Sequence, residues 1–207
     1  MKTWYLDDII EHAKDLKYTF YVPPKSVTDR LGHGNEVRLR FNLQNPSSVG
    51  PGAERMWVEI TERDGNNFTG LLTNEPQYIE NLKLGDKIHF QTNNIMDTDL
   101  QSEEPDLIKK YIHRCFVSNE ILHGKKKIKY LYRDESKGEW KDGIFDSGWV
   151  IMSGEESQDY VDDSKNLSVV SLGAVLNIDD SILSVLDEPI GVEFEWNDEE
   201  MRFEKVN

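Results

Sequence analysis

The apolar positions near the N-terminus follow helical spacing. Residues that recur at the i, i+3, i+4 interval of an amphipathic helix are Leu6, Ile9, Ile10, Ala13 and Leu16. Asp7 and Asp8 fall in the first turn of this helix, where they suit the positive end of its dipole. A second short helix is expected over residues 24–31, with Pro24 in its first position and Gly32 as a left-handed C-terminal cap.

A strand pattern replaces the helical one further along the chain. Val37, Leu39 and Phe41 alternate with arginines, which predicts a half-buried strand. After a loop rich in Gly, Pro and Ser at 45–52, alternating residues at 56–61 and 68–73 flank an Asp-Gly turn at 64–65 and predict a hairpin. Residues 87–90 predict a further strand. These short strands indicate a small curled sheet packed by the N-terminal helices.

A polar stretch at 96–104 and a short helix opened by Pro105 place a module boundary near residues 100–112. Beyond it, the pattern predicts strands at 113–117, 128–133 and 148–152, helices at 172–176 and 182–186, and a hairpin over 192–203. We expect an α+β fold of two small modules, residues 1–100 and 113–207. Each is expected to hold a mainly antiparallel curled sheet packed with short helices.

Composition supports a folded protein. Apolar residues make up 37% of the 207 positions, and no stretch approaches the roughly 20 apolar residues of a membrane span. The N-terminus has no apolar signal-peptide core, and the single cysteine, Cys115, agrees with a reducing compartment, so a cytoplasmic location is expected. Cys115 lies in an apolar strand and is expected to be a buried, inert thiol. Trp149 is expected in the core.

Charge adds the most to this picture. The net charge is −15, and nearly all of the negative excess lies in residues 134–207. Such a field repels nucleic acid and anionic membranes, and it attracts a basic protein. Acidity that only maintains solubility is the alternative interpretation.

Motifs of catalysis are missing from the sequence. It has no glycine-rich phosphate loop, no Gly-x-Ser-x-Gly elbow, no His-x-x-x-His pair and no second cysteine. We therefore expect no catalytic residue, no metal and no cofactor, and we interpret His33 as a loop residue. Two alternatives stay open. One is a hydrolase or metal-binding protein that uses the carboxylates around Asp146 and Glu155, and the other is a regulatory or nucleic-acid-binding module that uses the basic turn at 125–127.

Residues from about 113 to 207 resemble the bacterial immunity-protein-33 family, formerly the 2185 domain of unknown function. The matching segments are 115–118 (Cys-Phe-Val-Ser), 130–133 (Tyr-Leu-Tyr-Arg), 146–149 (Asp-Ser-Gly-Trp), 153–156 (Ser-Gly-Glu-Glu), 160–163 (Tyr-Val-Asp-Asp), 176–179 (Leu-Asn-Ile-Asp) and 186–191 (Leu-Asp-Glu-Pro-Ile-Gly). This chain differs by a longer insert at 136–144. The resemblance implies a protein of bacterial toxin–immunity loci.

Residues from about 20 to 95 resemble a second bacterial family, the 2314 domain of unknown function. The matching segments are 54–60 (Glu-Arg-Met-Trp-Val-Glu-Ile), 70–76 (Gly-Leu-Leu-Thr-Asn-Glu-Pro) and 82–88 (Leu-Lys-Leu-Gly-Asp-Lys-Ile). This resemblance implies a small α+β module. Neither family brings a catalytic residue.

The acidic excess and the immunity-like segments coincide in the C-terminal module. We expect a non-catalytic binding protein that neutralises a basic bacterial toxin domain. The acidic run 155–163 lacks the Asp-x-Asp-x-Asp-Gly layout of a calcium loop, so it is interpreted as a partner surface. The expected contact residues are Glu155, Glu156, Asp159, Tyr160, Asp162 and Asp163.

Overall fold

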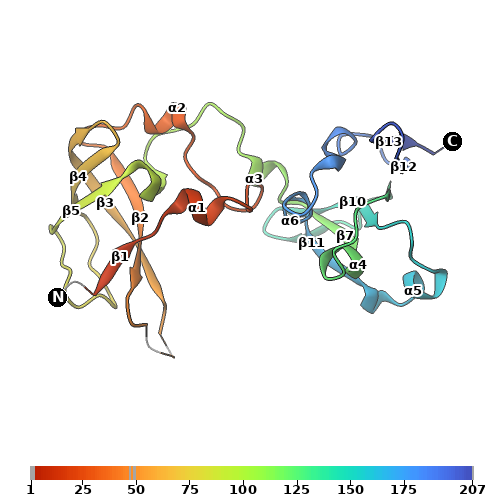
Figure 1. Cartoon of the computed structure of the whole chain (residues 1–207), viewed down its shortest axis with the longest axis horizontal. Helices are drawn as coiled ribbons and strands as arrows, with labels where there is room; N and C mark the ends of the chain where they lie inside the picture. Colours follow the sequence, from red (N-terminus) through yellow and green to blue (C-terminus); the bar gives the residue numbers. More distant parts are fainter. Residues whose placement is uncertain (1–2, 47, 49, 207) are drawn as a thin grey trace. The chain divides into compact units, whose positions relative to one another are not determined.

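Figure 1 shows the computed structural model, which describes residues 3–46, 48 and 50–206. The chain divides into two units, Met1–Pro105 and Asp106–Asn207, and each unit has its own sheet and its own buried residues. No helix in the described ranges is long and apolar enough to cross a membrane.

The sheet of the first unit is antiparallel throughout. Its strands are β1 (Trp4–Leu6), β2 (Glu36–Leu43), β3 (Ala53–Asp64), β4 (Asn67–Leu72), β5 (Lys87–Gln91) and β6 (Ile95–Thr98). Strands β1 to β5 pair in sequence order, while β6 pairs with residues 37–39 of β2 and β1 pairs with residues 41–43. Because β2 also pairs with β3 along its length, the sheet curls around its core. This confirms the curled sheet expected from the sequence.

The alternation predicted for these strands is confirmed. Val37, Leu39 and Phe41 of β2 are fully buried, and alternate residues 56, 58 and 60 of β3 face the same core. The β3–β4 hairpin turns at Gly65, whose φ of 58° lies in the left-handed region that glycine tolerates. Residues 47 and 49 of the expected loop lie outside the described residues.

The N-terminal helices are shorter than predicted. They are α1 (Ile9–Ala13) and α2 (Lys25–Thr28), and an unpredicted single turn, η1 (Thr92–Asn94), joins β5 to β6. Leu6 belongs to β1 instead, and helix α1 starts after Asp8, whose carboxylate accepts the Glu11 N–H at 3.0 Å. Gly32 is not left-handed as predicted. Gly34 takes that conformation, with φ at 87°, in the turn that leads into β2.

The second unit holds a mixed sheet. Its strands are β7 (Arg114–Ser118), β8 (Tyr130–Arg133), β9 (Glu139–Lys141), β10 (Ile144–Met152), β11 (Leu167–Ser171), β12 (Glu193–Asn197) and β13 (Arg202–Lys205). The order is β11-β7-β10-β8-β12-β13, with β9 paired to β10. All pairs are antiparallel except β7–β10, which is parallel. The predicted α+β class with mainly antiparallel sheets is confirmed.

Short helices complete the second unit. They are α3 (Leu107–Lys110), α4 (Asn119–Leu122), α5 (Gln158–Asp162) and α6 (Leu172–Leu176), with single turns η2 (Ser164–Asn166) and η3 (Ser181–Ser184). Trp149 on β10 is fully buried, as predicted, and its indole N–H donates to the Leu186 carbonyl at 3.2 Å. Cys115 is also buried, as predicted. The sequence analysis did not predict α4, α5, η2, β9 or β11, and β9 lies inside the expected polar loop.

Candidate functional site

One face of the second sheet is free of the main core. Side chains alternate along each strand, so Leu131, Trp149 and Phe194 point to the buried face and their neighbours point to the other. Cross-strand register then forms one row on that other face, through Val169, Phe116, Val150, Tyr132 and Glu193. Every residue of this row is partly or fully exposed. The row is apolar and aromatic for four positions and ends on a carboxylate.

Two hollows lie on this face. The first, here called the tyrosine hollow, measures about 490 Å³, and its lining includes Lys129, Tyr130, Tyr132, Glu155, Glu195 and Trp196. The second, the aspartate hollow, measures about 240 Å³, and its lining includes Phe116, Asp134, Glu135, Asp146, Val150 and Asp162. Tyr132 and Val161 line both. The two hollows are therefore adjacent, and we call them together the acidic groove.

The groove carries a concentrated negative charge. Seven carboxylates line it, and two ammonium groups offset them to give a net charge of −5. The Lys129 ammonium lies 2.8 Å from Asp198, whereas the Lys137 ammonium lies 4.6 Å from the centre of the Phe116 ring. Since hollows with low-dielectric walls concentrate a field, the groove favours cations over anions.

The two tyrosines of the groove stay neutral at physiological pH. Burial raises the pKa of Tyr130, and the nearby Glu193 carboxylate adds to the effect. Burial also raises the pKa of Tyr132, with a further contribution from Asp134. The ring centroids are 5.9 Å apart. The pair therefore offers adjacent phenol rings whose hydroxyls can donate hydrogen bonds.

The six predicted contact residues divide between the groove and the segment beside it. Glu155 is exposed and lies 3.2 Å from the Lys126 ammonium. Glu156 turns inward, and its carboxylate accepts the Ser153 N–H at 2.9 Å. Burial disfavours the charged form of Glu156, but hydrogen bonds from Ser118 and Ser153 outweigh it, so the pKa is lowered. Glu156 therefore stabilises the loop at the groove wall.

The other four predicted residues lie on α5 and just after it. Asp162 lines the aspartate hollow and accepts a hydrogen bond from the Gln158 amide at 2.8 Å. Asp163 caps η2 by accepting the Lys165 N–H at 3.0 Å, and the Tyr160 hydroxyl donates to the Asn166 carbonyl at 3.4 Å. Asp159 is exposed on α5. Three of the six, Glu155, Glu156 and Asp162, line the groove.

Sequence reasoning missed the other half of the groove. Tyr130 and Tyr132 on β8 and Glu195 on β12 meet because β8 pairs with both β10 and β12. The two-residue spacing of these side chains indicates which residues share a face of one strand. It does not indicate which strands are neighbours, so the groove itself could not be predicted.

The carboxylates of the hydrolase alternative line different hollows. Asp146 is 4% exposed, and its two carboxylate oxygens accept the N–H groups of Lys137 at 3.0 Å and Gly148 at 2.9 Å. It lines the aspartate hollow, while Glu155 lines the tyrosine hollow. Within the described part of the chain, no three His, Cys, Asp or Glu side chains form a group that could hold a metal ion.

The basic turn of the nucleic-acid alternative is interleaved with carboxylates. The Lys126 ammonium lies 2.7 Å from Glu120 and 3.2 Å from Glu155. The hydrogen bonds that the Lys126 ammonium donates to Glu120 and then to Glu155 raise the pKa of Lys126. Part of the positive charge of this turn is therefore paired within the protein.

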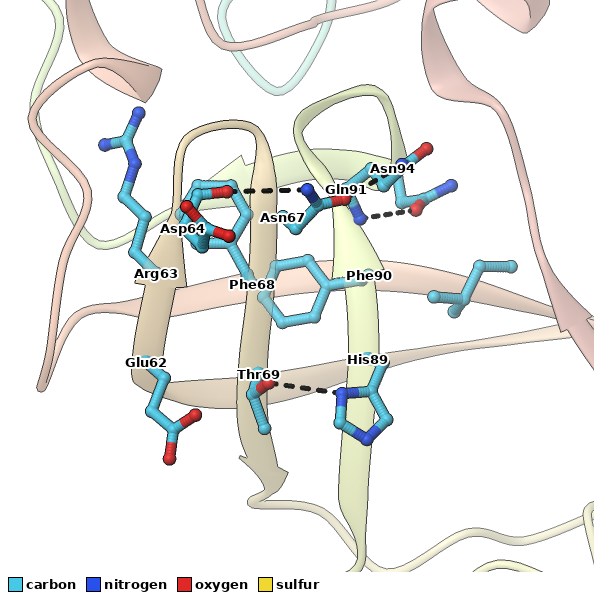
Figure 2. A pocket seen from close by; sticks show the side chains of 11 residues that line it. Glu62, Arg63, Asp64, Asn67, Phe68, Thr69, His89, Phe90, Gln91 and Asn94 are labelled. Atoms are coloured by element: carbon cyan, nitrogen blue, oxygen red, sulfur yellow. Dashed lines mark hydrogen bonds between the residues drawn. The ribbon is translucent and has the colours of Figure 1, made fainter.

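The first unit has a hollow of about 560 Å³, seen in Figure 2. Its side chains bond to each other: the Thr69 hydroxyl lies 3.1 Å from His89 Nδ1, and the Gln91 amide donates to Asn67 at 3.0 Å. Arg63 at its edge donates to the carbonyls of residues 28, 29 and 31. These groups are used to hold strands and loops together, so the acidic groove is the stronger candidate site.

Two family matches cover most of the chain, and the first of them extends across the boundary between the two units. Residues 24–142, more than half of the chain, match the family described as "Uncharacterized protein conserved in bacteria (DUF2314)". The chain belongs to this family. Residues 115–207 of this DUF2314 protein also match the immunity protein Imm33 domain. Both resemblances predicted from the sequence are confirmed. No curated protein and no solved structure matches the chain.

The two matches overlap within the second unit of the DUF2314 protein. The overlap, residues 115–142, holds α4, β8, β9 and all of β7 except its first residue. All residues that line the acidic groove fall between Phe116 and Trp196, inside the Imm33 match. The candidate site therefore lies in the part of the chain that matches the Imm33 domain.

Proposed function

We propose that the protein is a non-catalytic immunity protein, which neutralises a bacterial toxin by binding it through the acidic groove of the second unit. The observation that carries the proposal is the Imm33 match over residues 115–207, which contains the whole groove. The toxin is a basic protein domain, and the binding takes place in the cytoplasm.

The charge of the second unit supports a basic partner. Residues 106–207 hold 22 acidic and 13 basic side chains, a net charge of −9, against −6 for residues 1–105. Eight of those 13 basic side chains lie before residue 134, so the remaining stretch keeps 20 carboxylates with five basic side chains. Complementary charge of this kind speeds the encounter of two proteins and discriminates against acidic competitors. The first unit supports or extends the contact.

The gene next to the one that encodes this protein supplies the test. Its product is purified and mixed with the full chain, and complex formation is measured by calorimetry at 50 and 300 mM salt. We expect a basic partner that binds in a one-to-one complex, with weaker affinity at the higher salt because exposed charges are screened. A partner that is acidic, or a product that does not bind, would contradict the proposal.

A further inference from the structure

We infer that the acidic groove binds an extended basic segment of the partner, with one arginine or lysine side chain in the tyrosine hollow and a second in the aspartate hollow. This inference rests on the proposed function in one respect only, namely that the partner is a toxin. The chemistry of the segment follows from the groove.

The tyrosine hollow has the composition of a site for a cationic side chain. Tyr130, Tyr132 and Trp196 line it, and the faces of such rings attract ammonium and guanidinium groups. Glu155 and Glu195, both exposed, line the same hollow and can accept charge-assisted hydrogen bonds. Glu155 already lies 3.2 Å from the Lys126 ammonium, but an apolar side chain in the hollow would give neither carboxylate a charge-assisted hydrogen bond, so the hollow favours a cation.

In the aspartate hollow, a lysine of the protein itself already makes a cation–π contact of this kind. The Lys137 ammonium lies 4.6 Å from the centre of the Phe116 ring, and both residues line the hollow. Asp134, Glu135 and Asp162 surround it with more negative charge than Lys137 can neutralise. The negative charge that Lys137 does not neutralise can therefore attract a second cation, supplied by a partner.

The apolar residues of the groove favour a protein segment over a free cation. Val150, Val161 and Leu167 line the aspartate hollow, and their methyl groups can cover the aliphatic stems of lysine and arginine side chains. Since both hollows share Tyr132 and Val161, two cationic side chains of one extended segment can enter them together. Nucleic acid is disfavoured because its phosphates meet a groove of net charge −5.

The test uses the full chain labelled with ¹⁵N and a capped pentapeptide, Gly-Arg-Gly-Arg-Gly. In an NMR titration at low salt, we expect saturable shift changes at the amides of Tyr132, Val150 and Val161. The matched peptide Gly-Glu-Gly-Glu-Gly is expected to leave these amides unchanged. Shift changes confined to residues outside the groove, or none with the arginine peptide, would overturn the inference.

Two matched double variants distinguish the effect of the groove carboxylates from the effect of the protein's net charge. Replacing Glu155→Gln and Glu195→Gln together is expected to weaken binding of the arginine peptide about tenfold at low salt. The control, Glu199→Gln with Glu200→Gln, removes the same charge from the β12–β13 turn and is expected to change affinity less than about twofold. Tyr132→Leu replaces the aromatic ring with an aliphatic side chain, and it is expected to weaken binding of the arginine peptide about threefold. Equal losses in the groove and control variants would contradict the inference.

The peptide experiment and the partner experiment test the groove inference and the immunity proposal separately. If the arginine peptide binds the groove while the neighbouring gene product does not bind the chain, the immunity proposal fails and the groove inference stands. If the gene product binds wild type and the doubly substituted groove variant equally well, the groove inference fails and the toxin is bound elsewhere on the chain, so only the immunity role itself stands.

Discussion

At the scale of single residues, burial decides which chemical groups of the second unit can act. Cys115 is fully buried on β7, and burial together with Asp146 raises its thiol pKa to about 12. Glu155 is exposed at the groove rim, whereas its neighbour Glu156 is turned inward by the Ser153 N–H. The sequence identified both the inert thiol and the acidic segment, but two adjacent glutamates look alike until the loop that holds them is known.

Cys115 is predicted to resist alkylation in the folded protein. The thiolate is the reactive form, and with a pKa of about 12 almost none exists at pH 8. Iodoacetamide at pH 8 should leave the native protein unmodified, as measured by intact mass, and should modify it once in 8 M urea. Rapid labelling of the native protein would show that β7 opens readily.

Glu156 is predicted to add stability that depends on pH. Its folded pKa is lowered from 4.5, so ionised Glu156 stabilises the fold at neutral pH, and this contribution is lost as pH falls through the folded pKa. Glu156→Gln should therefore reduce the free energy of unfolding at pH 7. The difference from wild type should shrink below about pH 4. Urea unfolding at pH 7 and below about pH 4 measures the stability of both proteins. A stability difference that grows in acid would contradict the stabilising role given to ionised Glu156.

At the scale of elements, β10 organises the groove. It pairs in parallel with β7 and antiparallel with β8, and the register with β7 shifts between Asp146 and Val150. Gly148 lies in this irregularity with φ at 80°, and its carbonyl accepts the Asp134 N–H at 2.8 Å. The apolar run at 148–152 predicted a buried strand. It could not predict a parallel partner, because pairing depends on where distant segments return to the sheet.

Gly148→Ala is predicted to destabilise the protein by about 3 kcal/mol, because an added Cβ would overlap the Asp134 carbonyl and the left-handed backbone disfavours alanine. Gly32→Ala is the matched control. Nothing lies within 4 Å of a Cβ at Gly32, and its φ is not left-handed, so the change should be small. Chemical denaturation of the two variants makes the comparison. A mild Gly148→Ala would mean that the β8–β10 connection can move.

At the scale of the whole molecule, sequence patterns predicted the class of fold and the character of the surface. Period-two alternation placed most strands, as in β2 and β12, because each buries one face. The acidic excess predicted an acidic candidate surface. The groove itself depends on the pairing of β8 with β10 and β12, which brings Tyr132 beside Val150, 18 positions away, and beside Glu193, 61 positions away. No local pattern contains that information.

Growth rescue tests the central claim most directly. Cells that express the toxic product of the neighbouring gene also receive wild-type protein, a groove variant carrying Glu155→Lys and Glu195→Lys, or a control carrying Glu199→Lys and Glu200→Lys. All three are checked for equal soluble expression. We predict that wild type and the control restore growth and that the groove variant does not, because reversed charge repels a basic toxin. Failure of wild type to restore growth, or full rescue by the groove variant, would contradict a toxin-neutralising acidic groove.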